Sequence, residues 1–215
     1  MVKPKDGYLL DPMEEDHLGL YEDKAKQFFS NRRLKELKKR IDAVGDNKTV
    51  LELGCGHGYV MDFAYNPTNT YTGIDINPNS IEIARKRHQG RQNVELRAGD
   101  VMKVDYPDNA ADIVICTEVL EHLPDPEATL KEINRVLKPG GIFVSTVPFE
   151  WLLVFIRTLI LPVRLMQGRG IFVDAHLHYF NYWSYKKFLA AHFAIDEIRH
   201  AEFGFRILAV CRKDA

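Results

Sequence analysis

Short runs of β-branched and apolar residues alternate with longer amphipathic stretches through the centre of the chain. Two of the runs, 112–117 and 142–147, have the composition of strands buried on both faces of a parallel sheet. Between the runs, apolar residues recur at spacings of three and four, which predicts helices. Strands that alternate with helices predict an α/β fold. The predicted strands are Thr49–Leu53, Tyr71–Ile76, Val94–Ala98, Asp112–Thr117 and Ile142–Val147, and the predicted helices are Tyr59–Tyr65, Asn79–His88 and Pro126–Leu137.

The two ends of the chain depart from this alternation. Residues 20–44 have the apolar spacing of a helix, with lysines and arginines on its far side. Near the C-terminus, a predicted helix at Ser184–His192 precedes two β-rich runs, Ile195–Ala201 and Phe205–Cys211. Only a few residues around Gly204 join these two runs, so they must pair as an antiparallel hairpin.

Composition and charge exclude several classes of protein. With 215 residues, 46% hydrophobic and 27% charged, the chain suits one globular domain rather than a disordered or fibrous protein. Its 29 Lys and Arg against 30 Asp and Glu give a formal charge of −1, so a nucleic-acid partner would need a local basic patch. We expect no DNA partner and disfavour RNA. Three cysteines cannot form a disulfide framework, and the N-terminus lacks the apolar region of a secretory signal. We therefore expect a cytoplasmic protein.

A glycine-rich loop follows the first predicted strand, in the sequence LELGCGHG at residues 51–58. Glycines at such a turn let the backbone approach a ligand closely, and Asp75, at the end of the next strand, is placed to accept hydrogen bonds from two ribose hydroxyls. The nicotinamide fingerprint needs its third glycine one residue later, where this chain has Tyr59. Glu52 would repel a phosphate but suit an ammonium group. The loop favours a cationic nucleoside, S-adenosylmethionine, over the alternative of a turn with no ligand.

With these motifs in the same order along the chain, residues 48–148 resemble the class I S-adenosylmethionine-dependent methyltransferases. ELGCGHG resembles their first motif, whose glycines face the methionine part of the cofactor. GIDIN implies Asp75 on the ribose and Ile76 beside the adenine, and AGDVMKVDY implies Asp100 on the adenine amino group with Val101 against the ring. DIVICTEVLEHLPDP implies further residues at the sulfonium end. The cofactor-binding residues that the resemblance implies are Glu52, Gly54, Cys55, Gly56, Gly58, Asp75, Ile76, Asp100, Val101, Thr117, Glu118 and Leu120.

The resemblance also implies the architecture. The family has a Rossmann-like α/β fold with a seven-stranded, mostly parallel sheet in the order 3-2-1-4-5-7-6, strand seven antiparallel, and helices on both faces. This order agrees with the antiparallel hairpin inferred at the C-terminus. We expect Trp183 and Tyr185 to belong to the core. A single domain, 1–215, would comprise an N-terminal helical lid (1–45), a cofactor-binding core (46–148), an acceptor-side insertion (149–182) and a C-terminal helix and hairpin (183–215).

The residues after the fourth strand bear on the identity of the acceptor. Members that methylate DNA or glutamine nitrogen often carry an Asn/Asp-Pro-Pro-aromatic tetrad there, and this chain has Thr-Glu-Val-Leu at 117–120 instead. The run Glu-Val-Leu-Glu-His at 118–122 is similar to small-molecule methyltransferases that include quinone-biosynthesis O-methyltransferases. We expect an enzyme (EC 2.1.1.-) that methylates a small acceptor, with oxygen favoured. The alternatives are an RNA or protein methyltransferase, or a non-catalytic cofactor-binding module that regulates a partner.

Histidines supply the candidate catalytic groups. Glu118, Glu121 and His122 have the spacing that gathers side chains on one side of a helical turn. Downstream, His176 and His178 lie where the chain re-enters the core. In the resembling enzymes such a run, plus a later histidine, either has a structural role or holds a divalent ion against the acceptor hydroxyl. We assign His122 and His178 as the catalytic candidates, with either His122 or His178 as the general base, and commit to no metal.

An apolar stretch at 151–166 lies between these two groups and is interrupted by Arg157, Pro162 and Arg164. Two interpretations stay open. It is either an interfacial helix or lid for a lipophilic acceptor, with peripheral contact to a membrane, or a helix packed on the core or in a dimer interface.

Overall fold

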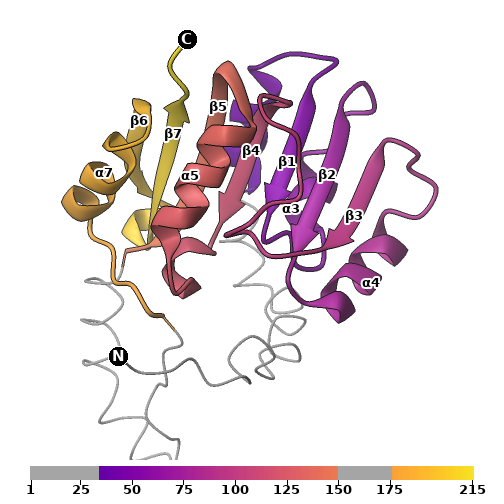
Figure 1. The fold of residues 1–215 in the computed structure, drawn as a ribbon, viewed down its shortest axis with the longest axis horizontal. Helices are drawn as coiled ribbons and strands as arrows, with labels where there is room; N and C mark the ends of the chain where they lie inside the picture. The colour runs from indigo at the N-terminus through magenta and orange to yellow at the C-terminus, as the bar shows by residue number, and fades with distance from the viewer. Residues whose placement is uncertain (1–33, 150–175) are drawn as a thin grey trace, which may run out of the picture.

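The computed structural model describes residues 34–149 and 176–215 (Figure 1). Its first helical segment covers residues 34–42 and buries Leu34, Leu37 and Ile41. Within the described residues each predicted strand and helix is present; β1 and β3 have the predicted ends, and the ends of the others are shifted. The strands are β1 (Thr49–Leu53), β2 (Thr70–Asp75), β3 (Val94–Ala98), β4 (Ala111–Thr117), β5 (Leu137–Pro148), β6 (Ala194–Ala201) and β7 (Arg206–Arg212). The helices are α3 (Tyr59–Phe63), α4 (Pro78–Arg87), α5 (Pro126–Val136) and α7 (Tyr182–Ala190), with 3₁₀ turns at Leu120–His122 and Glu202–Gly204.

The seven strands form one sheet in the order β3-β2-β1-β4-β5-β7-β6. The neighbours from β3 to β5 are parallel, whereas β7 runs antiparallel to both β5 and β6. This order and the direction of β7 confirm the predicted Rossmann-like fold class.

A hydrophobic cluster covers each face of the sheet. On one face, α5 and α7 pack against side chains that include Leu53, Val114 and Phe143. On the other face, segment 34–42, α3 and α4 pack against Val50 and its neighbours. Figure 1 shows α5 and α7 in front of the sheet. Burial on both faces explains why the central strands are apolar throughout rather than alternating.

The cap of α7 accounts for one difference from the sequence prediction. The Asn181 side chain accepts a hydrogen bond from the backbone N–H of Ser184, whose hydroxyl accepts one from the Asn181 N–H. This capping box starts the helix at Tyr182. Tyr185 is fully buried, as predicted, but Trp183 is 74% exposed. The prediction that Trp183 belongs to the core is wrong, because residues two apart on a helix point to different sides.

A buried pair of hydroxyls offers a test of this packing. The Tyr185 and Ser145 hydroxyl oxygens lie 2.6 Å apart, and both residues are fully buried. Either Tyr185→Phe or Ser145→Ala leaves the other hydroxyl without this partner, so each should lower the free energy of unfolding by about 1–2 kcal/mol. We expect the double variant to cost less than the sum of the single effects. Urea unfolding of the four proteins measures this, and strictly additive losses would contradict it.

Candidate active site at the carboxyl edge of the sheet

The predicted site residues follow the carboxyl ends of four neighbouring strands, β3, β2, β1 and β4. We call this side of the sheet the carboxyl edge. Because these strands are parallel, the loops that follow them meet there. The chain folds locally so that the loop after β1 occupies the middle of this edge, between the loops after β2 and β4.

Hydrogen bonds fix the glycine loop (residues 54–58) against β2. The backbone N–H groups of Gly54 and Cys55 donate to the carbonyl of Ile74, at 2.8 and 3.1 Å. The Gly56 N–H donates to Asp75 Oδ2 at 2.8 Å. Gly56 has φ +49°, and a Cβ built on it would meet no atom of the described residues within 4 Å. The loop therefore turns its backbone toward Asp75 and leaves space beside Gly56.

Asp75 joins two of the loops at the carboxyl edge. Besides Gly56, it accepts a hydrogen bond at Oδ1 from the backbone N–H of Asn77, at 2.9 Å. A carboxylate has about four acceptor positions, so Asp75 retains capacity for hydroxyl donors. The next side chain, Ile76, is 39% exposed, which suits contact with a flat ring.

The loop after β3 is tied to the same place. The Gly99 N–H donates to the Asp75 carbonyl at 2.9 Å, and Asp100 Oδ1 accepts from the Met102 N–H at 2.8 Å. Val101 is buried and belongs to the core cluster on the α5 face. The predicted adenine-binding residues Asp100 and Val101 thus sit beside the predicted ribose-binding residue, on adjacent loops.

Two buried groups lie next to the glycine loop. Glu52 is only 2% exposed, and within the described residues its Oε2 has no hydrogen-bond partner. Burial, and then the nearby charge of Asp75, raise the pKa of Glu52 to about 8, against a hydrogen bond from the Met61 backbone that lowers it. Burial likewise raises the pKa of the Cys55 thiol well above its usual range. Glu52 would gain from a cationic ligand, whereas Cys55 is an unreactive thiol.

The residues after β4 form two separate groups rather than the single helical turn predicted. Glu118 has φ +56°, so its side chain leaves the turn. Its Oε1 accepts from the Thr146 hydroxyl at 2.9 Å, and its Oε2 lies 2.5 Å from Arg206 Nε. Thr117 ends β4, and the Leu120 side chain is fully buried in the core. The expectation that Glu118 gathers with the next Glu-His pair is wrong, because the helical geometry begins only at Leu120.

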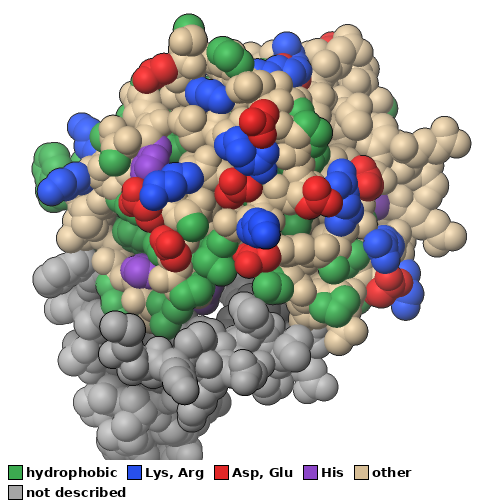
Figure 2. All heavy atoms as spheres, in the orientation of Figure 1, with side chains coloured by type: hydrophobic (Ala, Val, Ile, Leu, Met, Phe, Trp, Pro, Cys, Tyr) green, Lys and Arg blue, Asp and Glu red, His purple; other side chains and the backbone are tan. Residues whose placement is uncertain are grey.

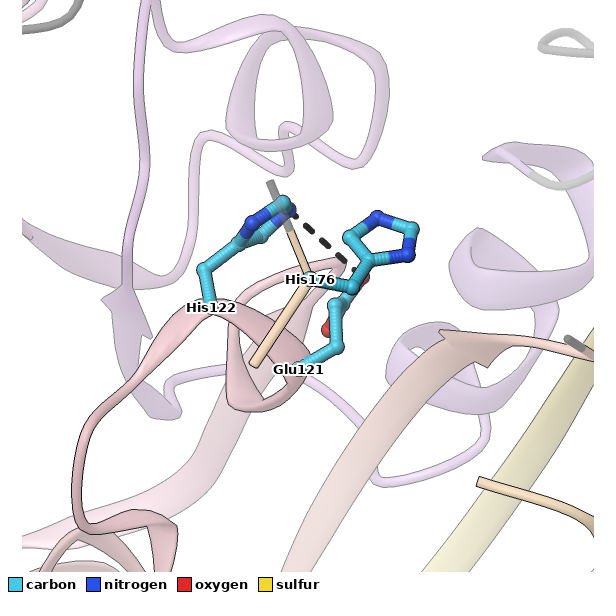
Figure 3. Close-up of side chains that lie close together, drawn as sticks. All are labelled: Glu121, His122 and His176. Atoms are coloured by element: carbon cyan, nitrogen blue, oxygen red, sulfur yellow. Dashed lines mark ion pairs between the residues drawn. The ribbon is translucent and has the colours of Figure 1, made fainter. Parts of the chain in front are cut away.

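Glu121, His122 and His176 form the second group (Figure 3). Each offers one ligand-type atom, and these atoms all lie within 4.8 Å of one another. Glu121 is 1% exposed, its Oε1 lies 3.9 Å from His122 Nε2, and the two imidazole rings are 4.7 Å apart. The Glu121 carbonyl accepts from the backbone N–H groups of Leu177 and His178. This group contains His176 rather than His178, whose ring stacks beside Phe180.

Sequence reasoning missed Arg206 as a site residue. Its only signal was indirect: Arg206 opens β7, and an antiparallel β7 beside β5 brings that position to the carboxyl edge, opposite Pro148. The stretch 151–166 and the predicted lid lie outside the described residues, apart from 34–45. Of the helices in the described ranges, none is long and apolar enough to cross a membrane.

Comparison with known proteins bears on the family and the fold. Residues 51–145 match a family model described as a methyltransferase domain. A curated demethylmenaquinone methyltransferase of Staphylococcus aureus (strain Newman) is 39% identical over 97 residues, which are 44% of this chain and 40% of that protein. The chain thus aligns with about two fifths of the length of this relative.

Solved structures share the fold. The N-methyltransferase NodS from Bradyrhizobium japonicum, in complex with S-adenosyl-L-homocysteine, has a TM-score of 0.66 at 19% identity, over 87% of this chain and 88% of NodS. A SAM-dependent methyltransferase from Methanosarcina mazei has a TM-score of 0.64 at 21% identity, over 79% and 94% of the two chains. The fold and carboxyl edge define an α/β protein of the Rossmann-like class. Residues 51–145 are thus similar to a methyltransferase domain, and the described residues share the fold of solved S-adenosylmethionine-dependent methyltransferases.

Glu52 gives this site a pH-dependent stability. In the unfolded chain it ionises near pH 4.5, while the folded protein keeps it protonated up to about pH 8. Stability contributed by this group therefore falls as pH rises between those values. We expect Glu52→Gln to raise the melting temperature by about 2–6 °C at pH 8 and hardly at all at pH 5. The exposed Glu82→Gln is the matched control, and a gain independent of pH would contradict the assignment.

Proposed function

We propose that this chain transfers a methyl group from S-adenosylmethionine to a small, lipophilic acceptor, with oxygen as the receiving atom. The observation that carries the proposal is the hydrogen bond between the glycine loop and Asp75, within a segment that matches a methyltransferase domain. The space beside Gly56 and the buried Glu52 fit a nucleoside whose amino-acid end is cationic. The similarity to an enzyme named for demethylmenaquinone supports a lipophilic acceptor.

In this mechanism, bound S-adenosylmethionine supplies a methyl group already activated on a sulfonium. The chain has to bind the cofactor and the acceptor, orient the acceptor toward the methyl group and remove a proton from the acceptor. Asp75 would accept hydrogen bonds from the ribose hydroxyls, and Asp100 would accept one from the adenine amino group. Glu52 would offset the positive charge of the cofactor. As the oxygen–methyl bond forms and the sulfur–methyl bond breaks, the hydroxyl proton would pass to the side chain of His122, which is about one third exposed.

Apolar side chains beside the histidines support a lipophilic acceptor. Leu177 and Tyr179, which follow His176, are exposed by 41% and 57%. On the face with α5 and α7, Figure 2 shows Lys and Arg interspersed with Asp and Glu, with no broad area of one sign. That distribution favours a small acceptor over RNA. Peripheral membrane contact through 151–166 remains part of the proposal, on sequence alone.

Cofactor binding is the first test. We expect S-adenosylmethionine and S-adenosylhomocysteine to bind with micromolar dissociation constants in calorimetric titration, and NADH not to bind. Asp75→Asn should weaken binding by tenfold or more, because hydrogen bonds to a charged acceptor are among the stronger ones. The exposed Glu95→Gln serves as the matched carboxylate control. Failure of the wild-type protein to bind either compound would sink the proposed function.

The catalytic step has a second test. With labelled S-adenosylmethionine and a panel of lipophilic phenols and quinols, mass spectrometry of the product locates the methyl on oxygen, carbon or nitrogen. We expect His122→Gln to lower kcat by about 10²-fold or more. His192 is paired with Glu127 rather than with the grouped histidines, so His192→Gln should retain activity. We expect the activity to be unchanged when a chelator removes divalent metal ions.

Loss of activity in chelator, with recovery on adding a divalent metal, would instead support a cation on the three grouped side chains, Glu121, His122 and His176. These residues could hold such an ion, since carboxylate and imidazole are ordinary ligands for it. An unchanged kcat in His122→Gln would overturn the assignment of His122 as the base.

A further inference from the structure

The last turn of α4 reaches under the glycine loop. Arg87 Nε donates to the carbonyl of His57 at 3.0 Å, and His88 Nε2 lies 3.0 Å from the carbonyl of Gly58. The last residue of α4 and the C-cap residue after it thus bind two consecutive carbonyls of the loop. The same loop presents the Gly56 N–H to Asp75.

The contact of His88 has a defined direction. Arg91 Nη1 lies 2.9 Å from His88 Nδ1, and a guanidinium only donates, so Nδ1 must accept. The proton of the neutral ring is therefore on Nε2, which donates to the Gly58 carbonyl. His88 is buried, and that burial lowers its pKa, which keeps the ring in this neutral form.

The fit between helix and loop is close. Gly58 has φ +75°, and a Cβ placed on it would lie 2.7 Å from His88 Nε2. The Arg87 guanidinium lies 3.6 Å from the centre of the Tyr59 ring, just beyond the loop. Arg91 Nη2 lies 2.7 Å from Asp62 Oδ1 in α3, so the helix after the loop is held as well.

The other end of α4 meets the same site. The Asn77 side chain caps the helix, and the Asn77 backbone N–H donates to Asp75 Oδ1 at 2.9 Å. The ten-residue helix Pro78–Arg87 therefore connects the carboxylate proposed for the ribose to the loop proposed for the methionine part.

We infer that Arg87 and His88 form a clamp that sets cofactor affinity by holding the glycine loop in its binding conformation. They are positioning residues, since they act through the loop carbonyls. The inference rests on the proposed function. A loop already ordered before the ligand arrives loses less conformational freedom on binding, which raises affinity without any new contact. No such role follows from the glycine motif itself, because both residues lie about thirty positions further along the chain.

The test measures two quantities for each variant. One is the dissociation constant of S-adenosylhomocysteine, and the other is the melting temperature of the ligand-free protein, which shows whether the variant is folded. We expect His88→Leu to weaken binding about tenfold, and His88→Gln, whose amide can still donate to Gly58, to recover most of that loss. Arg87→Ala should weaken binding by a similar factor. Lys86→Ala, exposed on the same turn, is the matched control and should bind like the wild type.

The outcomes separate this inference from the proposed function. If the wild-type protein binds neither S-adenosylhomocysteine nor S-adenosylmethionine, the proposed function fails. If the wild type binds and folded His88→Leu and Arg87→Ala bind equally well, the clamp is overturned and the function stands. Weaker binding in His88→Leu without recovery in His88→Gln would also overturn it, because the donated hydrogen bond would then not be the cause.

Discussion

The hydrogen bond from the Gly56 N–H to Asp75 is the interaction on which the rest of the site depends. It joins the loop after β1 to the end of β2, and the Gly99 N–H then attaches the loop after β3 to the Asp75 carbonyl. Three loops from neighbouring parallel strands are thereby held in one arrangement. The order of the sheet makes this feasible, because parallel strands deliver their loops to the same edge.

Electrostatics decide which ligand this arrangement suits. Glu52 is buried near Asp75, and this burial, together with the neighbouring charge of Asp75, raises the pKa of Glu52 to about 8. A phosphate would bring further negative charge beside Asp75 and would oppose ionisation of Glu52 still more, whereas an ammonium or sulfonium would favour the ionised Glu52. Glu52 therefore opposes a phosphate through its burial beside Asp75, a property that the spacing of the glycines alone does not reveal.

The sheet could be predicted from the sequence because its strands are apolar on both faces and its last two are joined by a tight turn. Local departures from these patterns could not be predicted. Glu118 follows a helical spacing, but its left-handed backbone turns it to Arg206 instead of to His122. Trp183 is exposed because the Asn181 cap sets the phase of α7. Such details depend on single backbone angles and on partners distant in sequence, which no periodic pattern records.

The ion pair of Glu118 with Arg206 also bears on the acceptor. Arg206 opens β7 at the carboxyl edge and is balanced by Glu118 at 2.5 Å, with Glu202 at 3.9 Å. An arginine matched by two carboxylates has little attraction left for an anionic substrate, because its charge is already offset. An uncharged ligand at this edge incurs no such competition. The charge balance at this edge therefore gives no added attraction to a phosphorylated ligand, which is consistent with the neutral acceptor that we propose.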